Sequence, residues 1–214
     1  MKLLTVGDSF TYGEELSNLD LAWPQQLANK IGFELTNWAR RSSGNTRMVR
    51  NVAMNAKYFD LIIIAWSHFA RIEFADEIGS YDLWPGCHSS PHDQSAPWRA
   101  EAVNYITKHH NDSYLYRKYL IDIVLLQTFL KANNKNYIML DAFGNNQIRN
   151  KFKEKNQDLL DQIDTSKYLG WPDQSMMEWT FGTPQGPRGH FLEDGHRIVT
   201  DKVYEYIRHL GWIS

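Results

Sequence analysis

The sequence predicts an α/β domain with a mostly parallel sheet that helices cover on both sides. The clearest observation is the run at 60–66, DLIIIAW, because an unbroken series of apolar, mostly β-branched residues is typical of a parallel strand buried on both faces. A second observation is that strand-like apolar runs alternate along the chain with helix-like segments. The length of 214 residues is that of one domain of this class.

The individual elements follow from short-range patterns. Strands are expected where short apolar runs are bounded by polar or turn-forming residues, at 2–6, 33–38, 60–66 and 136–141. Helices are expected where apolar residues recur at helical spacing or where a start signal stands: from Trp23 with Pro24 in the first turn, after the turn at 43–45, over about 113–132, and around Ile198 to Leu210. Residues 78–97 suggest a long irregular loop, and 145–185 show no clear pattern.

Composition excludes several classes of function. The formal net charge is −2 with basic residues scattered along the chain, which gives no support for a nucleic-acid partner. No segment approaches the roughly 20 apolar residues of a membrane span, and the apolar run after Lys2 is too short for a signal peptide, so we expect a cytoplasmic protein without a membrane partner. Cys87 is the single cysteine, and its neighbourhood matches no strong zinc pattern, so neither metal nor cofactor is expected.

Polar turns follow several of the predicted strands. Gly7-Asp8-Ser9 comes after the first strand, Ser43-Gly44-Asn45 after the second, Trp66-Ser67-His68 at the end of the third, and Asp141 at the end of the fourth. Because ligands bind at the carboxyl ends of the strands in open α/β sheets, these turns predict one polar site at that edge. Ser9, just past a buried strand, is the candidate nucleophile, and a serine needs a base to activate it.

These blocks resemble the SGNH (GDSL-like) hydrolase family. The resemblance rests on GDSFTYG at 7–13, on Gly44-Asn45 after the second strand, and on a histidine before the last helix. It covers nearly the whole chain as scattered blocks, and it implies one domain over 1–214 with an irregular insertion at about 75–112. The resemblance implies a three-layer α/β/α sandwich with a flavodoxin-like sheet. It also implies Ser9 as nucleophile, and N–H groups of Ser9 and Gly44 in an oxyanion hole.

Two features depart from the family pattern. The asparagine of its third block is absent, since Ala65-Trp66-Ser67-His68 stands there. Ser67, His68 and Asn45 are therefore the alternative oxyanion donors. Trp66, His68 and Trp84 are candidates for lining the substrate pocket. The acid expected three residues before the base is also absent, because Pro187 occupies that position.

Two histidines compete as the base. The family pattern and the loop position before the last helix favour His190, which would act in a Ser-His dyad or with an acid from elsewhere, Asp141 being one candidate by its strand-end position. The alternative is His196 with Glu193 as its acid, because this pair keeps the family spacing.

The function expected from these residues is hydrolysis of a carboxylic ester through an acyl-enzyme on Ser9. By resemblance, the substrate is a small-molecule or carbohydrate ester, such as an O-acetyl group on a sugar. Two alternatives stay open: an acyltransferase that uses the same residues, and a non-catalytic glycan- or partner-binding module on the same fold.

Overall fold

A five-stranded parallel sheet forms the centre of the computed structural model, which describes residues 1–75, 80–87 and 97–213. Its strands are β1 (Lys2–Val6), β2 (Glu34–Asn37), β3 (Leu61–Trp66), β6 (Asn136–Asp141) and β7 (Tyr168–Leu169). They lie in the order β2-β1-β3-β6-β7, and every neighbouring pair is parallel. Relabelled along the chain this order is 2-1-3-4-5, the flavodoxin-like arrangement, so the expected fold class is confirmed.

Alternation along β3 shows how the sheet is buried on both faces. All six residues of this strand are buried. Ile62 and Ile64 pack into the apolar cluster on one face, and Leu61, Ile63 and Ala65 pack into the cluster on the other. Because successive side chains of a strand point to opposite faces, a strand between two helical layers must be apolar at every position.

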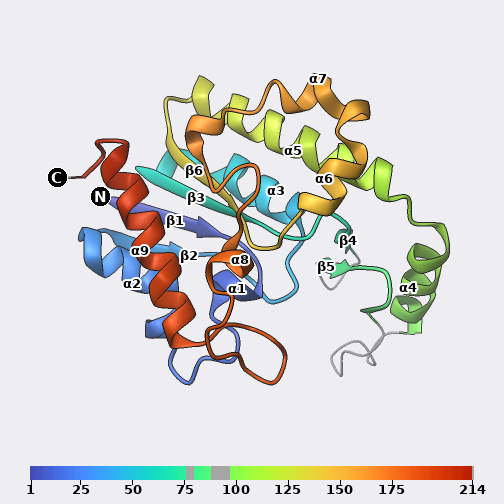
Figure 1. Cartoon of the computed structure of the whole chain (residues 1–214), viewed down its shortest axis with the longest axis horizontal. Coiled ribbons are helices and arrows are strands. Elements are labelled where there is room, and N and C mark those ends of the chain that lie inside the picture. The colour runs from blue at the N-terminus through green and yellow to red at the C-terminus, as the bar shows by residue number, and fades with distance from the viewer. Residues whose placement is uncertain (76–79, 88–96, 214) are drawn as a thin grey trace.

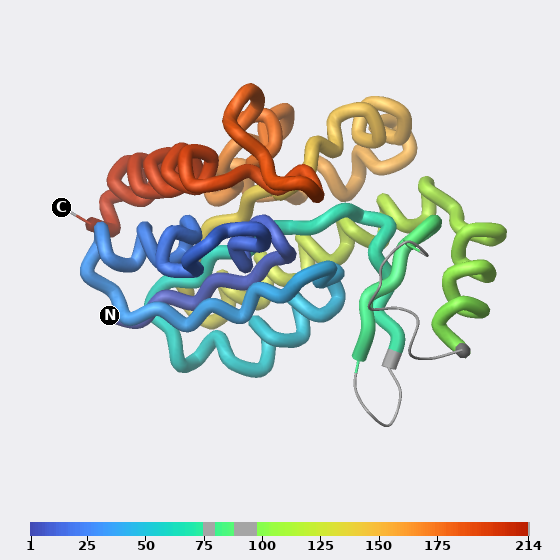
Figure 2. Tube along the Cα trace, turned by 90° about the horizontal axis from the view of Figure 1, so that it is seen from below, coloured from blue at the N-terminus to red at the C-terminus, as the bar shows by residue number. Residues whose placement is uncertain are grey.

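Helices cover both faces of the sheet (Figures 1 and 2). On one face lie α3 (Asn45–Asn55) and α5 (Asp112–Ala132), which contribute to the first cluster. On the other face lie α2 (Trp23–Ile31) and α9 (Glu193–His209), which contribute to the second. The expected start of α2 at Trp23 is confirmed, and α9 carries acidic residues in its first turn and basic residues in its last, which favours both ends of the helix dipole.

The segment without a clear pattern at 145–185 holds only short elements. They are α6 (Asn146–Phe152), α7 (Gln157–Leu160), β7 and α8 (Met176–Trp179), with 3-10 turns at Glu154–Asn156 and Thr165–Lys167. Two further 3-10 turns lie at Leu19–Leu21 and Ala56–Tyr58. A two-residue strand such as β7 is too short to show any periodicity, which is why sequence patterns do not reveal it.

The insertion at about 75–112 is more regular than expected. Strands β4 (Ile72–Ala75) and β5 (Ser80–Leu83) form an antiparallel hairpin, and α4 (Pro97–His109) follows, so the prediction of an irregular loop is wrong at 80–83. Residues 76–79 and 88–96 of that loop lie outside the described part of the chain. An ion pair of 2.8 Å between Arg47 Nε on α3 and Asp82 Oδ2 holds the hairpin beside the sheet edge.

Among the helices that the structure describes, none combines the length and the apolar character needed to cross a bilayer.

The first testable prediction concerns Gly7, where β1 turns into the next helix. A Cβ placed on Gly7 would lie 2.2 Å from Oγ1 of Thr11, which is completely buried. Replacing Gly7 by Ala should therefore lower the free energy of unfolding by about 1–3 kcal/mol, the usual cost of overpacking. Denaturant unfolding of Gly7→Ala, Thr11→Ala and the double variant measures the coupling. If Gly7→Ala lowered the free energy of unfolding equally with Thr11 and with Ala at position 11, this explanation would be contradicted.

Candidate active site

Ser9 lies just beyond the carboxyl end of β1. It opens the short helix α1 (Ser9–Tyr12), and Asp8 caps that helix by accepting a hydrogen bond of 3.1 Å from Phe10 N. The backbone N–H of Ser9 belongs to the first helical turn, whose N–H groups have no acceptor inside the helix. Ser9 is 5% exposed, so its side chain is accessible only from one direction.

His190 reaches Ser9 from the loop that leads into α9. Its Nε2 lies 2.9 Å from Ser9 Oγ, which is hydrogen-bond distance. The loop is closed on itself by a bond of 2.8 Å from Gly186 N to His190 O, and the imidazole packs on the ring of Phe10 at 4.9 Å. The structure therefore brings together the two residues that the sequence singled out as nucleophile and base.

Glu15 supplies a carboxylate to the other side of the imidazole. Its Oε2 lies 2.8 Å from His190 Nδ1. The same carboxylate accepts from two further N–H groups of the loop: Arg188 N lies 2.9 Å from Oε1 and 3.1 Å from Oε2, and His190 N lies 3.3 Å from Oε2. These partners assign Nδ1 as the protonated nitrogen, which leaves Nε2 to accept the proton of Ser9. Ser9, His190 and Glu15 thus have the connectivity of a catalytic triad.

Two backbone features position this carboxylate. Glu15 has a φ of 71°, a left-handed conformation that is rare for a residue with a side chain. Gly186 lies directly against it, because a Cβ there would come within 2.6 Å of Glu15 Cδ. Loop 186–190 therefore wraps the Glu15 carboxylate where the family pattern has an aspartate of its own, at the position of Pro187.

Sequence reasoning did not identify Glu15. The resemblance directs attention to residues before the base, whereas this acid follows the nucleophile by six positions. The available signal is the pair Glu14-Glu15 directly after Gly13, together with a glycine at 186 and another at 189 in the opposite loop. Neither of these patterns predicts that Glu15 and the loop at 186–190 come into contact.

Electrostatics keep the Glu15 carboxyl ionised. Burial by itself raises the pKa of Glu15, but hydrogen bonds from the His190 ring and from the N–H of Arg188 outweigh burial, so its pKa lies below the ordinary 4.5. Glu14 adds a second negative charge, with Oε2 at 3.9 Å from His190 Nε2, and Arg188 holds Glu14 by an ion pair of 2.9 Å.

The rival histidine, His196, is a core residue. It is 1% exposed, and its Nδ1 accepts a hydrogen bond of 3.1 Å from Trp23 N at the start of α2. Burial, with a smaller effect of His190, lowers the pKa of His196 to about 3. The structure does not place the alternative pair at Ser9: His196 joins α9 to α2, and Glu193 opens the first turn of α9.

The residues expected to supply oxyanion donors besides Ser9 are already in contact with other groups of the protein. The Ser67 hydroxyl donates to Asp8 Oδ2 at 2.8 Å. The Asn45 side chain is engaged with the backbone of Ser67, donating to its carbonyl at 3.2 Å and accepting from its N–H at 2.9 Å. Gly44 lies against Asp82, whose Oδ1 would be 2.6 Å from a Cβ on that glycine.

The residues expected to line a substrate pocket separate into two groups. His68 and Trp84 line one cavity of about 240 Å³, together with Arg71 and Phe143. Trp66 does not line it: this residue is completely buried in the core, where its ring meets Tyr119 edge-on at 5.9 Å. An all-buried strand places Trp66 beneath α5, which corrects the expectation for this residue.

Asp141 is not the acid of this site. It accepts hydrogen bonds from the hydroxyls of Tyr119 and Tyr168, the latter at 2.8 Å, and Arg149 NH2 lies 3.5 Å away. Burial raises the pKa of Asp141, and Arg149 opposes that rise. Asp141 therefore anchors a buried polar network between α5 and α6.

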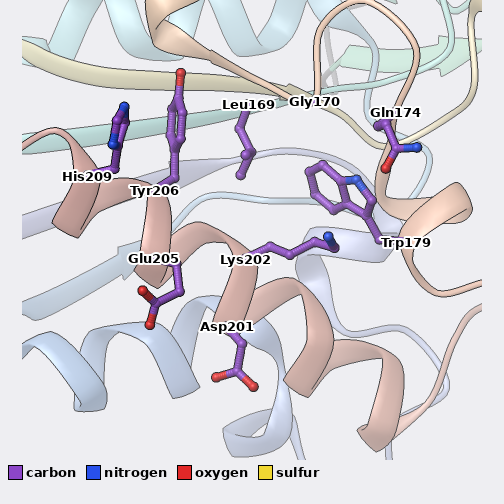
Figure 3. Close-up of a pocket in the computed structure, with 9 residues that line it drawn as sticks. All are labelled: Leu169, Gly170, Gln174, Trp179, Asp201, Lys202, Glu205, Tyr206 and His209. Carbon is purple, nitrogen blue, oxygen red and sulfur yellow. The ribbon is translucent and has the colours of Figure 1, made fainter.

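A larger hollow, of about 540 Å³, lies elsewhere on the molecule, between β7, α8 and α9 (Figure 3). Lys202 extends along it toward Trp179, while Tyr206 and His209 stand side by side on α9. The described residues that line it include no serine, threonine or cysteine. Within residues 1–75, 80–87 and 97–213, no group of three or more His, Cys, Asp or Glu side chains is placed to hold a metal ion.

A family model described as "Family of unknown function (DUF6071)" matches residues 13–214. The chain belongs to this family. No curated protein sequence matches the DUF6071 chain significantly.

Solved structures resemble the DUF6071 chain over almost its whole length. TesA shares 12% sequence identity with this chain at a TM-score of 0.61, and the match covers 98% of this chain and 99% of the TesA chain. The psychrotrophic esterase EstA from Pseudoalteromonas sp. is 13% identical with a TM-score of 0.57, covering 98% and 97%. A catalytic mutant of an acetylxylan esterase from Geobacillus stearothermophilus is 16% identical with a TM-score of 0.53, covering 96% and 93%. At this identity, the likeness establishes only that this chain shares the fold of these proteins.

The second prediction concerns the buried histidine of this DUF6071 chain. Because the pKa of His196 is about 3 in the folded protein and about 6.5 when unfolded, the unfolded state binds a proton between these values that the folded state does not. The free energy of unfolding should therefore fall as the pH drops below 6.5, by up to about 1.4 kcal/mol per pH unit. In His196→Asn, whose amide oxygen can still accept from Trp23 N, this part of the fall should vanish. Urea unfolding between pH 7 and 4 measures the free energy of unfolding of the wild type and of His196→Asn. If this free energy fell with pH equally in both proteins, the low pKa of His196 would be contradicted.

Proposed function

We propose that this protein is a serine esterase that hydrolyses carboxylic esters through an acyl-enzyme on Ser9. The observation that carries the proposal is the chain of two hydrogen bonds from Ser9 through His190 to Glu15. A buried serine, an imidazole whose Nε2 lies 2.9 Å from the serine hydroxyl and a carboxylate on the other side of the ring form the arrangement that makes a hydroxyl nucleophilic. The likeness of the fold to those of the esterase EstA and of the acetylxylan esterase is consistent with this chemistry.

The reaction follows from the positions of these three side chains. Ser9 Oγ attacks the ester carbonyl while its proton passes to His190 Nε2, and the carbonyl π electrons move to the oxygen. The carbonyl re-forms as the bond to the alkoxy group breaks, and His190 returns the proton to the departing alcohol. Water then attacks the acyl-enzyme by the same route in reverse, releasing the acid. Glu15 holds Nδ1–H and stabilises the imidazolium in both halves.

The cavity beside the site supports a small substrate group. At about 240 Å³, the space bounded by His68, Trp84, Arg71 and Phe143 is below the roughly 300–1,000 Å³ typical of drug-sized ligands. Phe143 meets Phe10 edge-on at 5.2 Å, so this cavity adjoins the residue after Ser9. An acyl group of the size of acetate fits these dimensions, and Trp84 offers an aromatic face to a sugar. We therefore favour O-acetyl groups on carbohydrate as the substrate.

The third prediction tests the proposed triad. Hydrolysis of p-nitrophenyl acetate and butyrate is measured for the wild type, Ser9→Ala, His190→Ala and Glu15→Gln, with His196→Asn as a matched control. Ser9→Ala and His190→Ala should lose at least about 10³-fold in kcat/KM. Glu15→Gln should lose up to about 10⁴-fold, because a neutral amide stabilises neither the tautomer nor the imidazolium. His196→Asn should hydrolyse both esters at the wild-type rate.

Two results would contradict the proposal. One is hydrolysis that persists in Ser9→Ala, which would place the nucleophile elsewhere. The other is a wild-type protein that hydrolyses neither ester and is not labelled by a fluorophosphonate, a reagent that needs only an activated serine. Such a protein would be the non-catalytic binding module on the same fold.

A further inference from the structure

Arg71 lies across the two turns that border Ser9. Its NH1 group is 3.1 Å from Asp8 Oδ2, in the turn after β1, and 3.1 Å from Ser43 O, in the turn before α3. Its Cβ packs on Gly44, at 3.4 Å from where a Cβ of that glycine would stand. The side chain is 11% exposed, so its charge is held in a largely dry environment.

The guanidinium also borders the cavity beside the site. It lies between two aromatic rings, 5.2 Å from the centroids of Trp84 and of Phe143, and with them it lines the 240 Å³ cavity. A guanidinium has five N–H donors, and the two bonds of Arg71 described above both come from NH1. In the described part of the chain, Nε and NH2 of Arg71 donate to no protein acceptor.

Apart from the backbone N–H of Ser9, the donors expected at this site are engaged with other groups or lie against a negative charge. The Ser67 hydroxyl donates to Asp8 and the Asn45 amide to Ser67 O. The carboxylate of Asp82 lies against Gly44, and a second negative charge forming there would be repelled by it. Among the described groups around these turns, Arg71 combines a positive charge with N–H donors that no described acceptor uses.

We propose that Arg71 is a catalytic residue that stabilises the oxyanion of the tetrahedral intermediate, in place of the third-block asparagine that this chain lacks. The inference rests on the proposed function, because an oxyanion forms only if Ser9 attacks a carbonyl. As the Oγ–C bond forms, the carbonyl π pair becomes a lone pair on oxygen and the hydroxyl proton moves to His190. Arg71 keeps its own protons throughout and donates N–H bonds to that oxygen, which are stronger in a dry site than in water.

The arrangement makes Asp8 a positioning residue. The Asp8 carboxylate accepts a hydrogen bond from NH1 of Arg71 and also caps the helix that begins at Ser9. Asp8 therefore fixes the position of Arg71 relative to Ser9. The hairpin β4–β5 is the reason that Arg71 is there, since this residue leads directly into β4. The segment between β3 and β4 thus supplies the donor that the end of β3 does not.

The fourth prediction is tested with a fluorophosphonate, because its rate of reaction with Ser9 needs no knowledge of the natural substrate. Attack forms the Oγ–P bond, expels fluoride and passes through a phosphoryl oxygen with added negative charge. The second-order labelling rate is measured for the wild type, Arg71→Ala and Arg71→Lys. Arg117→Ala, which removes an exposed guanidinium paired at 2.8 Å with Asp158, is the matched control.

Arg71→Ala should label about 10²–10³-fold more slowly, the usual effect of losing one oxyanion donor. Arg71→Lys keeps the charge opposite Asp8 but not the planar fork, so it should fold normally and label at an intermediate rate. Millimolar guanidinium chloride should restore part of the rate in Arg71→Ala, whereas sodium chloride at equal ionic strength should not. Arg117→Ala should label at the wild-type rate.

Either Arg71→Ala or Arg71→Lys labelling at the wild-type rate would overturn the role of Arg71 and leave the proposed function intact. The role would also be overturned if both variants were labelled slowly and guanidinium did not accelerate the labelling of Arg71→Ala. Such a result would mean that Arg71 only maintains the local structure. Absence of labelling in the wild type would instead refute the activated serine itself.

Discussion

The hydrogen bond between Glu15 and His190 is the contact on which the candidate site depends. It joins the segment after the first strand to the loop before the last helix, 175 positions apart in the chain. The carboxylate is held by three N–H donors, and Gly186 leaves the room it needs. The left-handed backbone at Glu15 carries a cost of about 1–3 kcal/mol, which persists because the surrounding contacts determine it.

A second constraint acts on the opposite side of Ser9. Asp8 is completely buried, and it can be so only because Ser67, Arg71 and the N–H of Phe10 supply hydrogen bonds. Burial raises the pKa of Asp8, and the positive charge of Arg71 opposes that rise. The hairpin that follows Arg71 is held to α3 by the ion pair of Arg47 and Asp82, so a hairpin outside the central sheet helps to position a polar group at the edge of that sheet.

The sheet and its main helices could be predicted from the sequence because each has a local signal, whereas the pairing of Ser9 with His190 was expected from the resemblance to a family. The run at 61–66 is apolar at every position, and Gly7-Asp8-Ser9 stands where a strand ends. The contact of Glu15 with His190 could not be predicted, because it joins two loops. No sequence periodicity indicates which residues of two loops come into contact. Trp66 was misplaced for a related reason: a strand-end position does not say whether a side chain points to the site or to the core.

The most direct test of the Glu15–His190 contact is proton NMR of ¹⁵N-histidine-labelled protein at low temperature. A proton shared between imidazole Nδ1 and a carboxylate resonates far downfield of the amide region, and its nitrogen coupling identifies it as a ring proton. We predict such a resonance in the wild type, its loss in His190→Ala and a large upfield shift in Glu15→Gln. A downfield ring proton that is unchanged in Glu15→Gln would contradict the account, because His190 would then be oriented by another group.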